Sequence, residues 1–306
     1  MPPPDRNAIT ERDCLQESNN AAFSAPPDRR SPHGKAGHFN DAGCIHLAHA
    51  FTDLSQDDSG VVARFANGVV TSADALIGCD GGRSAVRDKV HDSAPVAYSG
   101  QVSFRALVPA ERVPQELRTP SRCLSIGPGR MFLHYLLRKD SVMNIVANAR
   151  QPRWEAEGWA IRAEVSELLG LYGDFHPQVL RMIESIEPDA LFKWGLRDRE
   201  PLSQWTIGRV SMLGDAAHPM SPFLGQGAVM AIEDGMVLGR CFAKASTVEE
   251  ALALYENARK ERANAVQLES REQASALQGS HLEHFNPGRN AEDRGLFDYN
   301  PATVQI

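Results

Sequence analysis

The sequence predicts a mixed α/β fold, in which two strand–turn–helix segments enclose a region of strands and helices end the chain. Three observations support this. Two short apolar runs, at 75–79 and 210–213, each lead into a glycine-containing turn and a helical pattern. Between them, residues 98–150 alternate apolar and polar side chains, as strands do. A helical pattern that begins after Thr247 continues to about Leu277.

The composition is that of an ordinary globular protein and excludes several classes. Of the 306 residues, 42% are hydrophobic and 23% are charged, and the formal net charge of -7 argues against a nucleic-acid surface. Five cysteines without CxxC spacing indicate reduced thiols, so a cytoplasmic location is expected. No apolar run is long enough to span a bilayer, and the first residues lack the apolar region of a signal peptide.

The N-terminal segment differs from the rest of the chain. Residues 1–43 are rich in Pro, Asn, Asp, Ser and Arg and have no helical or strand periodicity. Such a composition cannot bury much apolar surface, so this segment is expected to be disordered or atypical.

Order is expected from Cys44 onward. Residues 44–51 are predicted to form a strand, and 61–72 a hairpin with a type I′ turn at Asn67-Gly68. The short apolar run 75–79 is predicted to be a strand buried on both faces.

The middle of the chain is expected to form a second sheet. Its predicted strands are 98–108, 130–138 and 141–148, with a hairpin tip at Lys139-Asp140. On the second of these strands Met131 and Tyr135 share one face, whereas His134 points to the other.

The remaining elements follow in order. Residues 155–187 are expected to be helical with a break at His176-Pro177, 193–205 to be extended, and 227–242 to form a helix. Thr247 and Glu250 make a capping box for the last helix. The tail 286–306 is expected to be loosely packed.

The first chemical motif follows the apolar run 75–79. Asp80, Gly81 and Gly82 make a tight turn, and Ser84 can cap the next helix. The amides at that helix start suit a pyrophosphate, and Asp80 can accept hydrogen bonds from ligand hydroxyls. A plain strand–turn–helix with a good N-cap is an equally good interpretation.

The second motif lies within 208–235. Asp215 follows a strand, where a carboxylate can bind a sugar-like hydroxyl chain, and Pro219 and Pro222 stiffen the loop. Gly225-Gln226-Gly227 lets backbone amides approach a flat ring, and the positive end of the next helix favours negative charge on that ring. The motif is suited to the ribityl chain and ring of a flavin. The alternative is a structural loop stiffened by prolines.

Together the two motifs resemble those of the FAD-dependent aromatic hydroxylases, which include salicylate and 6-hydroxynicotinate hydroxylases. Residues 74–87 are similar to that family's second FAD motif, with Cys79 in place of its usual alanine, and 208–235 are similar to its third. The resemblance extends from Cys44 to about residue 285.

The resemblance implies an incomplete FAD/NAD(P)-binding Rossmann-like domain interleaved with a mixed-sheet substrate domain. The expected boundaries are 44–97 and 194–285 for the partial FAD-binding domain, 98–193 for the substrate domain, and 286–306 for a C-terminal tail. The implied chemistry is NAD(P)H- and O2-dependent hydroxylation of a phenol or aromatic acid through a flavin C4a-hydroperoxide.

The resemblance also implies roles for single residues. Asp215 would bind the ribityl hydroxyls, and Ala228 would meet the flavin through its amide. Asp80 and Gly81 would lie near the ribose and pyrophosphate. The flavin ring would be lined by Pro222, Gly225, Gln226 and Gly227.

Two residues would face the substrate or the flavin, namely Arg105 and Tyr135. A structural ion pair is the alternative for Arg105, and core packing is the alternative for Tyr135. Some family members have a histidine, a candidate base, where this chain has Met131. The histidines lack further ligands at sensible spacing, so no metal site is expected.

One departure from the family pattern changes the expectation. The 306 residues contain no Gly-x-Gly-x-x-Gly, the turn that normally binds the FAD pyrophosphate. The chain therefore resembles an N-terminally truncated hydroxylase with weakened FAD binding. The alternative is a catalytically silent fragment or pseudoenzyme, and a complementing Rossmann-type chain or a homodimer is the partner that such a fragment would need.

Overall fold

The computed structural model describes residues 22–23, 45–92, 95–154, 156, 158, 161–277, 279 and 295–306. The segment expected to be disordered, 1–43, lies outside the described residues except for the short strand β1 (Ala22–Phe23), which pairs with β2 (Ile45–His46). The strand predicted at 44–51 is therefore short. Ala48 has a positive φ of 59°, which breaks the extended backbone before β3 begins.

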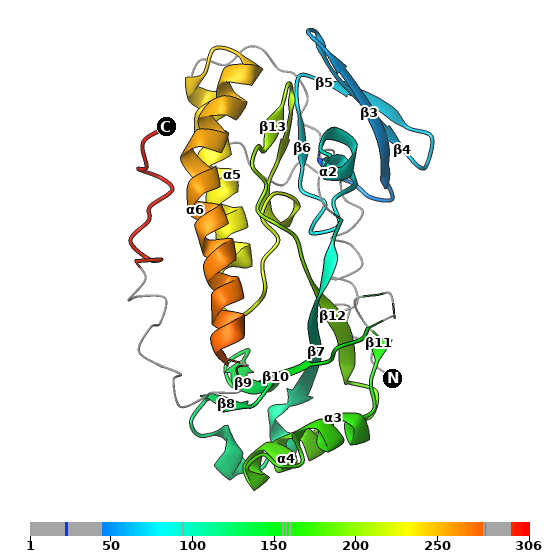
Figure 1. Ribbon diagram of the computed structural model, residues 1–306, viewed down its shortest axis with the longest axis vertical. Coiled ribbons are helices and arrows are strands. Elements are labelled where there is room, and N and C mark those ends of the chain that lie inside the picture. Colours follow the sequence, from blue (N-terminus) through cyan, green and yellow to red (C-terminus); the bar gives the residue numbers. More distant parts are fainter. Residues whose placement is uncertain are drawn as a thin grey trace, which may run out of the picture.

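A three-stranded antiparallel sheet forms the blue part of Figure 1. It consists of β3 (Phe51–Asp57), β4 (Gly60–Phe65) and β5 (Val70–Ala73). The hairpin predicted at 61–72 is confirmed, but its type I′ turn is wrong. Only Gly68 has a positive φ, because Asn67 uses its side chain to accept a hydrogen bond from the Val69 amide at 3.0 Å.

The strands of the two motifs lie side by side. β6 (Leu76–Gly78) is parallel to β14 (Val210–Met212), which also pairs with β13 (Thr206–Ile207). The prediction that the first of these strands is buried on both faces is only partly correct, since Leu76 and Ile77 are half-buried. Within the described residues β6 pairs with β14 alone, so its other edge has no strand to cover it.

A six-stranded antiparallel sheet occupies the other end of the molecule. Its order is β11 (Ile161–Arg162), β12 (Phe192–Asp198), β7 (Ala97–Pro109), β10 (Val142–Arg150), β9 (Arg130–Leu137), β8 (Arg122–Gly127). The three predicted strands are confirmed as β7, β9 and β10. The hairpin tip after β9 has three successive residues with positive φ, Arg138, Lys139 and Asp140.

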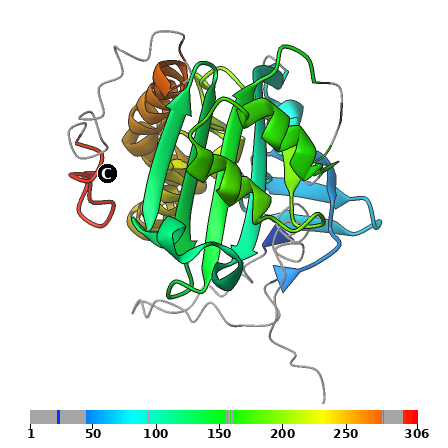
Figure 2. The ribbon, with the colours of Figure 1, turned by 90° about the horizontal axis from the view of Figure 1, so that it is seen from below.

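Two helices cover one face of this sheet, as Figure 2 shows, and their apolar sides meet its inward residues. They are α3 (Val165–Tyr172) and α4 (Pro177–Glu184), with the predicted break between them. The expectation that helix begins near 155 is wrong, because Ile161–Arg162 pairs with β12 as a strand. Two short 3-10 helices, η1 (Ala110–Arg112) and η2 (Gln115–Arg118), follow β7.

A second core lies beneath the two motifs. After β6 comes the short helix α2 (Ala85–Val90), and after β14 come the 3-10 helix η3 (Gly214–Ala216) and the helix α5 (Gly227–Lys244). α5 packs along α6 (Val248–Leu277). This core contains the buried side chains of Trp205, Met212, Val237 and Tyr255.

The C-terminal residues are not loosely packed. Arg240 of α5 donates hydrogen bonds to the Pro301 and Val304 carbonyls at 2.7 and 2.8 Å. Arg259 and Arg262 of α6 lie over the Tyr299 ring, 4.8 and 4.2 Å from its centroid. The expectation for the tail is therefore wrong for residues 295–306, because these arginines anchor the tail to both helices.

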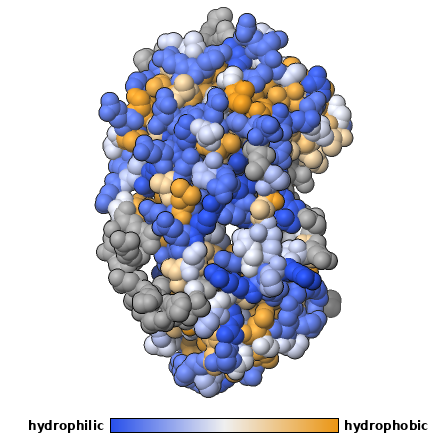
Figure 3. All heavy atoms as spheres, viewed as in Figure 1, coloured by the Kyte–Doolittle hydropathy of each residue, from blue (hydrophilic) through white to orange (hydrophobic). Residues whose placement is uncertain are grey.

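The surface of the described part is mainly hydrophilic on the face seen in Figure 3, which is hollowed at mid-height. Among the described helices, none is both long and apolar enough to cross a membrane.

Candidate functional site

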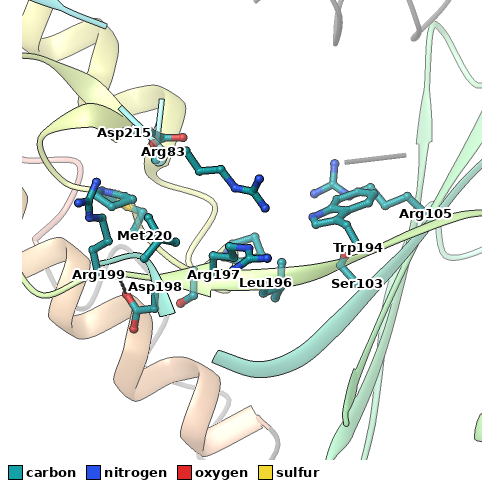
Figure 4. Close-up of a pocket in the computed structure, with 15 residues that line it drawn as sticks. Arg83, Ser103, Arg105, Trp194, Leu196, Arg197, Asp198, Arg199, Asp215 and Met220 are labelled. Carbon is teal, nitrogen blue, oxygen red and sulfur yellow. Dashed lines mark hydrogen bonds between the residues drawn. The ribbon is translucent and has the colours of Figure 1, made fainter. Parts of the chain in front are cut away.

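A cavity of about 290 Å³ lies between the two motif loops and the open face of the large sheet (Figure 4). The loops contribute Gly82, Arg83, Asp215 and 219–222, the sheet contributes Ser103, Arg105, Trp194 and 196–198, and Arg199 follows the end of β12. The opposite face of the sheet is filled by α3 and α4, so only this face is available to a ligand. The size is at the lower end of ligand and cofactor sites.

Asp215 reaches this cavity from η3. Gly214 before it has a φ of +60°, a conformation that glycine adopts without strain, and this turns the chain so that Asp215 faces outward. The Asp215 side chain is exposed to the cavity, although the surrounding loop removes part of the solvation of its carboxylate. Burial raises its pKa, and the nearby His218 only partly opposes the rise. None of the described residues donates a hydrogen bond to this carboxylate, so its oxygens can accept hydrogen bonds from a ligand.

A buried charge network holds the loop from behind. His218 Nε2 lies 2.6 Å from Asp234 Oδ2, the Gly214 amide donates to the same oxygen at 3.1 Å, and Arg259 Nε lies 2.8 Å from Asp234 Oδ1. Burial works against ionised Asp234, but His218 and Arg259 outweigh it and lower the carboxyl pKa. His218 stacks against Trp205 away from the cavity, so its position is that of a structural residue.

The start of α5 is open toward solvent. Gly225 has a φ of +66°, and no side chain caps the first turn of the helix. The first amides of an α-helix have no acceptor within the helix, so those of Gly227 and Ala228 are available to a ligand. Pro222 and Ala228 are exposed, whereas Gln226 is buried and its Oε1 has no hydrogen-bond partner among the described residues.

The first motif is engaged with the protein itself. Gly81 has the expected positive φ, of 82°, and Ser84 caps α2 by accepting from the Arg87 amide at 2.9 Å. Asp80 Oδ2 accepts from the Ala85 and Val86 amides at 2.8 and 3.1 Å. The amides expected to suit a pyrophosphate are thus already bonded to Asp80.

The sheet contributes the opposite wall of the cavity. Arg105 lies with its guanidinium 5.5 Å from the centroid of the Trp194 ring, and Figure 4 shows both side chains together. No described carboxylate forms an ion pair with Arg105, and its buried Nε has no partner within the same residues. Tyr135 shares this face of the sheet but does not line the cavity.

Sequence reasoning missed several residues of this wall. Trp194 lies directly opposite Ser103 in the β12–β7 register, and Arg83 follows the turn of the first motif. The pairing of strands far apart in the sequence assembles this wall, so no local spacing could have identified it. The alternation along 98–108 does place Ser103 and Arg105 on the same face.

These residues fit part of FAD. The first α5 amides are hydrogen-bond donors and the Asp215 carboxylate is an acceptor, and these are the kinds of group that a flavin ring and the hydroxyls of a ribityl chain can bind. No equivalent free amides serve a pyrophosphate in the described part, and the 306 residues contain no Gly-x-Gly-x-x-Gly. The described residues therefore fit the flavin half of the cofactor and not its phosphate half.

Known proteins with the same motifs include several hydroxylases. The chain is 35% identical over 209 residues to a 3-hydroxybenzoate 6-hydroxylase of Klebsiella oxytoca, covering 68% of this chain and 51% of that protein. It is 33% identical over 220 residues to a 6-hydroxynicotinate 3-monooxygenase of Pseudomonas fluorescens, covering 71% of this chain and 57% of that protein. The chain thus spans about half the length of these relatives.

Solved structures support the same fold. A salicylate hydroxylase substrate complex superposes with a TM-score of 0.73 over 87% of this chain and 73% of that chain, at 24% identity. HpxO of Klebsiella pneumoniae, complexed with FAD and uric acid, superposes with a TM-score of 0.68 over 77% of this chain and 59% of that chain, at 27% identity. The family model described as the FAD binding domain matches residues 40–270, and the chain belongs to this family.

Proposed function

We propose that this chain supplies the flavin-ring and substrate parts of an FAD-dependent monooxygenase that hydroxylates a small aromatic acid or phenol with NAD(P)H and O2. The observation that carries the proposal is the cavity between Asp215 and Arg105. Asp215 and Pro222 line one side of it, and Arg105, which has no ion-pair partner among the described residues, lies beside the Trp194 ring on the other.

The cofactor side is assigned as follows. Asp215 would accept hydrogen bonds from the ribityl hydroxyls, the Ala228 amide would donate to the ring, and Pro222 with Gly225, Gln226 and Gly227 would flank it. Reduced FAD would supply the activated oxygen. Asp80 and Gly81 would lie beyond the ring, toward the adenosine half, although Asp80 already caps α2.

The substrate side depends on charge. Arg105 is a cation without an ion-pair partner in the described part, and Trp194 provides a flat apolar surface next to it. An aromatic carboxylate or phenolate satisfies both, because a guanidinium binds carboxylate oxygens through two parallel hydrogen bonds. The relatives named for hydroxybenzoate and hydroxynicotinate support this class. Tyr135 would act from the same sheet face as a more distant substrate residue.

The organisation of the chain follows from these assignments. We propose a partial FAD-binding domain formed by 44–97 and 194–285 and a substrate domain formed by 98–193. The cavity lies where they meet. Free thiols at Cys79, Cys123 and Cys241 support the cytoplasmic location expected from the sequence.

The test is binding and turnover with added FAD. With FAD in excess, 3-hydroxybenzoate should stimulate NADH or NADPH oxidation. Arg105→Gln should weaken binding of 3-hydroxybenzoate by about tenfold or more, since hydrogen bonds to charged groups contribute roughly 1.5–3 kcal/mol. Arg105→Lys should restore binding only partly, because lysine lacks the planar fork.

Arg162→Gln is the matched control, since Arg162 lies on the same sheet and pairs with the exposed Asp189. It should leave binding unchanged. An unchanged affinity of Arg105→Gln would remove Arg105 from the substrate site.

The alternative function is a catalytically silent fragment or pseudoenzyme. The specific observation that favours it is the engagement of the α2 amides, which already donate to Asp80. A complementing Rossmann-type chain or a second copy could restore FAD binding, and the uncovered edge of β6 is the place where a further parallel strand would pair. If no FAD binds at high concentration and no substrate stimulates oxidation, the alternative stands.

A further inference from the structure

The cavity wall contains a hydroxyl that no feature of the protein explains. Ser103 lies in the centre of β7 and is fully buried, with 0% of its surface exposed. Its Oγ has no hydrogen-bond partner among the described residues, although the residue lines the cavity. A buried polar group without a partner costs stability, so a serine here has a disadvantage that alanine would not have.

The neighbours of Ser103 make this region polar. Asn148 lies directly opposite it on β10 and is 1% exposed, and its Oδ1 is also without a partner in the described part. Arg105 is two residues along the same strand, about 7 Å away and on the same face. Its buried Nε also has no hydrogen-bond partner among the described residues. Three unsatisfied polar atoms therefore lie on one side of the sheet, beside the cavity.

Trp194 fixes how a ligand can use these atoms. It lies opposite Ser103 on β12, so the indole borders the cavity next to the Ser103 hydroxyl. A ring lying against Trp194, with its anionic group at Arg105, brings another part of its edge toward Ser103. A substituent there meets a hydroxyl that can donate or accept a hydrogen bond.

We propose that Ser103 determines specificity in this cavity, and that its hydroxyl binds a second polar group, a hydroxyl or a ring nitrogen, on an aromatic ring whose anionic group is held by Arg105. The proposal rests on the proposed function, because the ring is the substrate of that function.

The experiment compares ligands that differ by one polar group. Dissociation constants of benzoate, the three monohydroxybenzoates, nicotinate and 6-hydroxynicotinate are measured calorimetrically with the FAD-saturated protein. Wild type should bind at least one hydroxylated or nitrogen-containing member about tenfold more tightly than benzoate. Ser103→Ala should remove that preference and leave benzoate binding unchanged, since one neutral hydrogen bond corresponds to roughly a tenfold change at most.

Two further variants separate specificity from folding. Ser103→Cys keeps a side chain of similar size with only a weak donor and should behave like Ser103→Ala. Ser99→Ala on the same strand removes a hydroxyl that already donates to the Leu196 carbonyl at 2.9 Å. It should lower the melting temperature and keep the ligand preference, whereas Ser103→Ala should keep or raise the melting temperature.

Each outcome has one meaning. Loss of the preference in Ser103→Ala and Ser103→Cys, with benzoate unchanged, supports the proposal. Equal weakening of all ligands, or no change, overturns it while the proposed function stands. If wild type binds none of the acids in the presence of FAD, the proposed function fails and the role of Ser103 fails with it. If Arg105→Gln binds benzoate as wild type does, Arg105 is not in the substrate site, and the role of Ser103 beside it is overturned.

Discussion

The position of Asp215 favours ligand binding but makes its ionisation unfavourable in the flavin-free protein. It lines the cavity, where a ligand hydroxyl can reach it, and its surroundings raise its pKa because burial disfavours the charged form. An ionised Asp215 at neutral pH therefore destabilises the fold slightly when no ligand donates to it, because solvent screens most of the cost of charging an exposed side chain. Binding a chain of hydroxyls would remove that disadvantage.

Asp215→Asn should consequently separate stability from binding. At pH 7 the flavin-free variant should melt at the same temperature as wild type or higher, while its dissociation constant for FAD should rise about tenfold, because hydrogen bonds to a charged acceptor are lost. Differential scanning fluorimetry and a flavin fluorescence titration measure the two quantities.

The control for this variant is Asp198→Asn, which changes another aspartate of the same cavity. Asp198 forms an ion pair with Arg271, in which Oδ2 lies 2.7 Å from Nε. Loss of this ion pair should lower the melting temperature without weakening the binding of FAD. A less stable Asp215→Asn protein with unchanged FAD affinity would contradict the assignment of Asp215 to the ribityl chain.

At the level of single residues, the sequence predicted the loop better than the sheet. Asp215 and Gly225 lie on one continuous segment, so their spacing alone puts them near the same ligand. Trp194 meets Ser103 only through strand register, which the sequence does not specify. Tyr135 was predicted on the correct face, but register puts β10 between it and Arg105, and it does not line the cavity.

The capping box of α6 is an element whose contribution can be measured. Thr247 Oγ1 accepts a hydrogen bond from the Glu250 amide at 3.2 Å. Glu250 Oε2 accepts in return from the Ser246 amide at 2.7 Å, one residue before the usual position of this contact. The box satisfies one amide of the first turn and one amide just before the helix.

Thr247→Ala should destabilise the protein by about 1 kcal/mol, the usual cost of losing an N-cap side chain. Urea unfolding monitored by circular dichroism gives the free energy. Ser275→Ala, near the other end of α6, removes an exposed hydroxyl that donates to the Arg271 carbonyl in its own helix. This control should change stability much less, and an equal loss in both variants would show that the cap has no special role.

Elements were predictable where one local pattern decides them. The period of two identified β7, β9 and β10, and Pro177 identified the break between α3 and α4. β11 was missed because two residues gain their extended conformation only by pairing with β12. The packed tail was missed because the arginines that hold it lie on α5 and α6, far away in the sequence.

The described part of the molecule has two large hydrophobic cores and a small cluster around Met230, and the cavity lies between the two large cores. One core lies between the large sheet and α3 with α4, and the other lies beneath β14, α5 and α6. On the sheet side, the cavity is lined by residues on the face opposite to the first core. The sequence predicted both halves, but their relative placement depends on long-range packing, and so the cavity itself was not predictable.

Two aspartates make opposite contributions to the pH dependence of this whole fold. The pKa of Asp234 lies below its ordinary value of 3.8, because His218 and Arg259 outweigh the cost of its burial. Asp234 therefore adds stability above pH 3.8 that is lost as the pH falls through its lower folded pKa. The pKa of Asp215 lies above 3.8, so its ionisation removes stability as the pH rises through 3.8 toward the higher folded value.

Acid unfolding curves of two variants should therefore move in opposite directions. Asp234→Asn should be destabilised by about 3–5 kcal/mol at pH 7, because it leaves Arg259 with a broken buried pair. The deficit should begin to shrink below pH 3.8 and continue to shrink as the pH falls toward the lower folded pKa of wild-type Asp234. Asp215→Asn should match or exceed wild type at pH 7, and its advantage should vanish below pH 3.8, where both proteins carry a neutral group. Free energies from urea unfolding between pH 3 and 8 check both trends.

The control is Asp189→Asn, which changes an exposed carboxylate paired with Arg162. Its stability should stay within about 1 kcal/mol of wild type throughout this pH range. If the Asp234→Asn deficit does not depend on pH, the stabilising role of its charge is refuted.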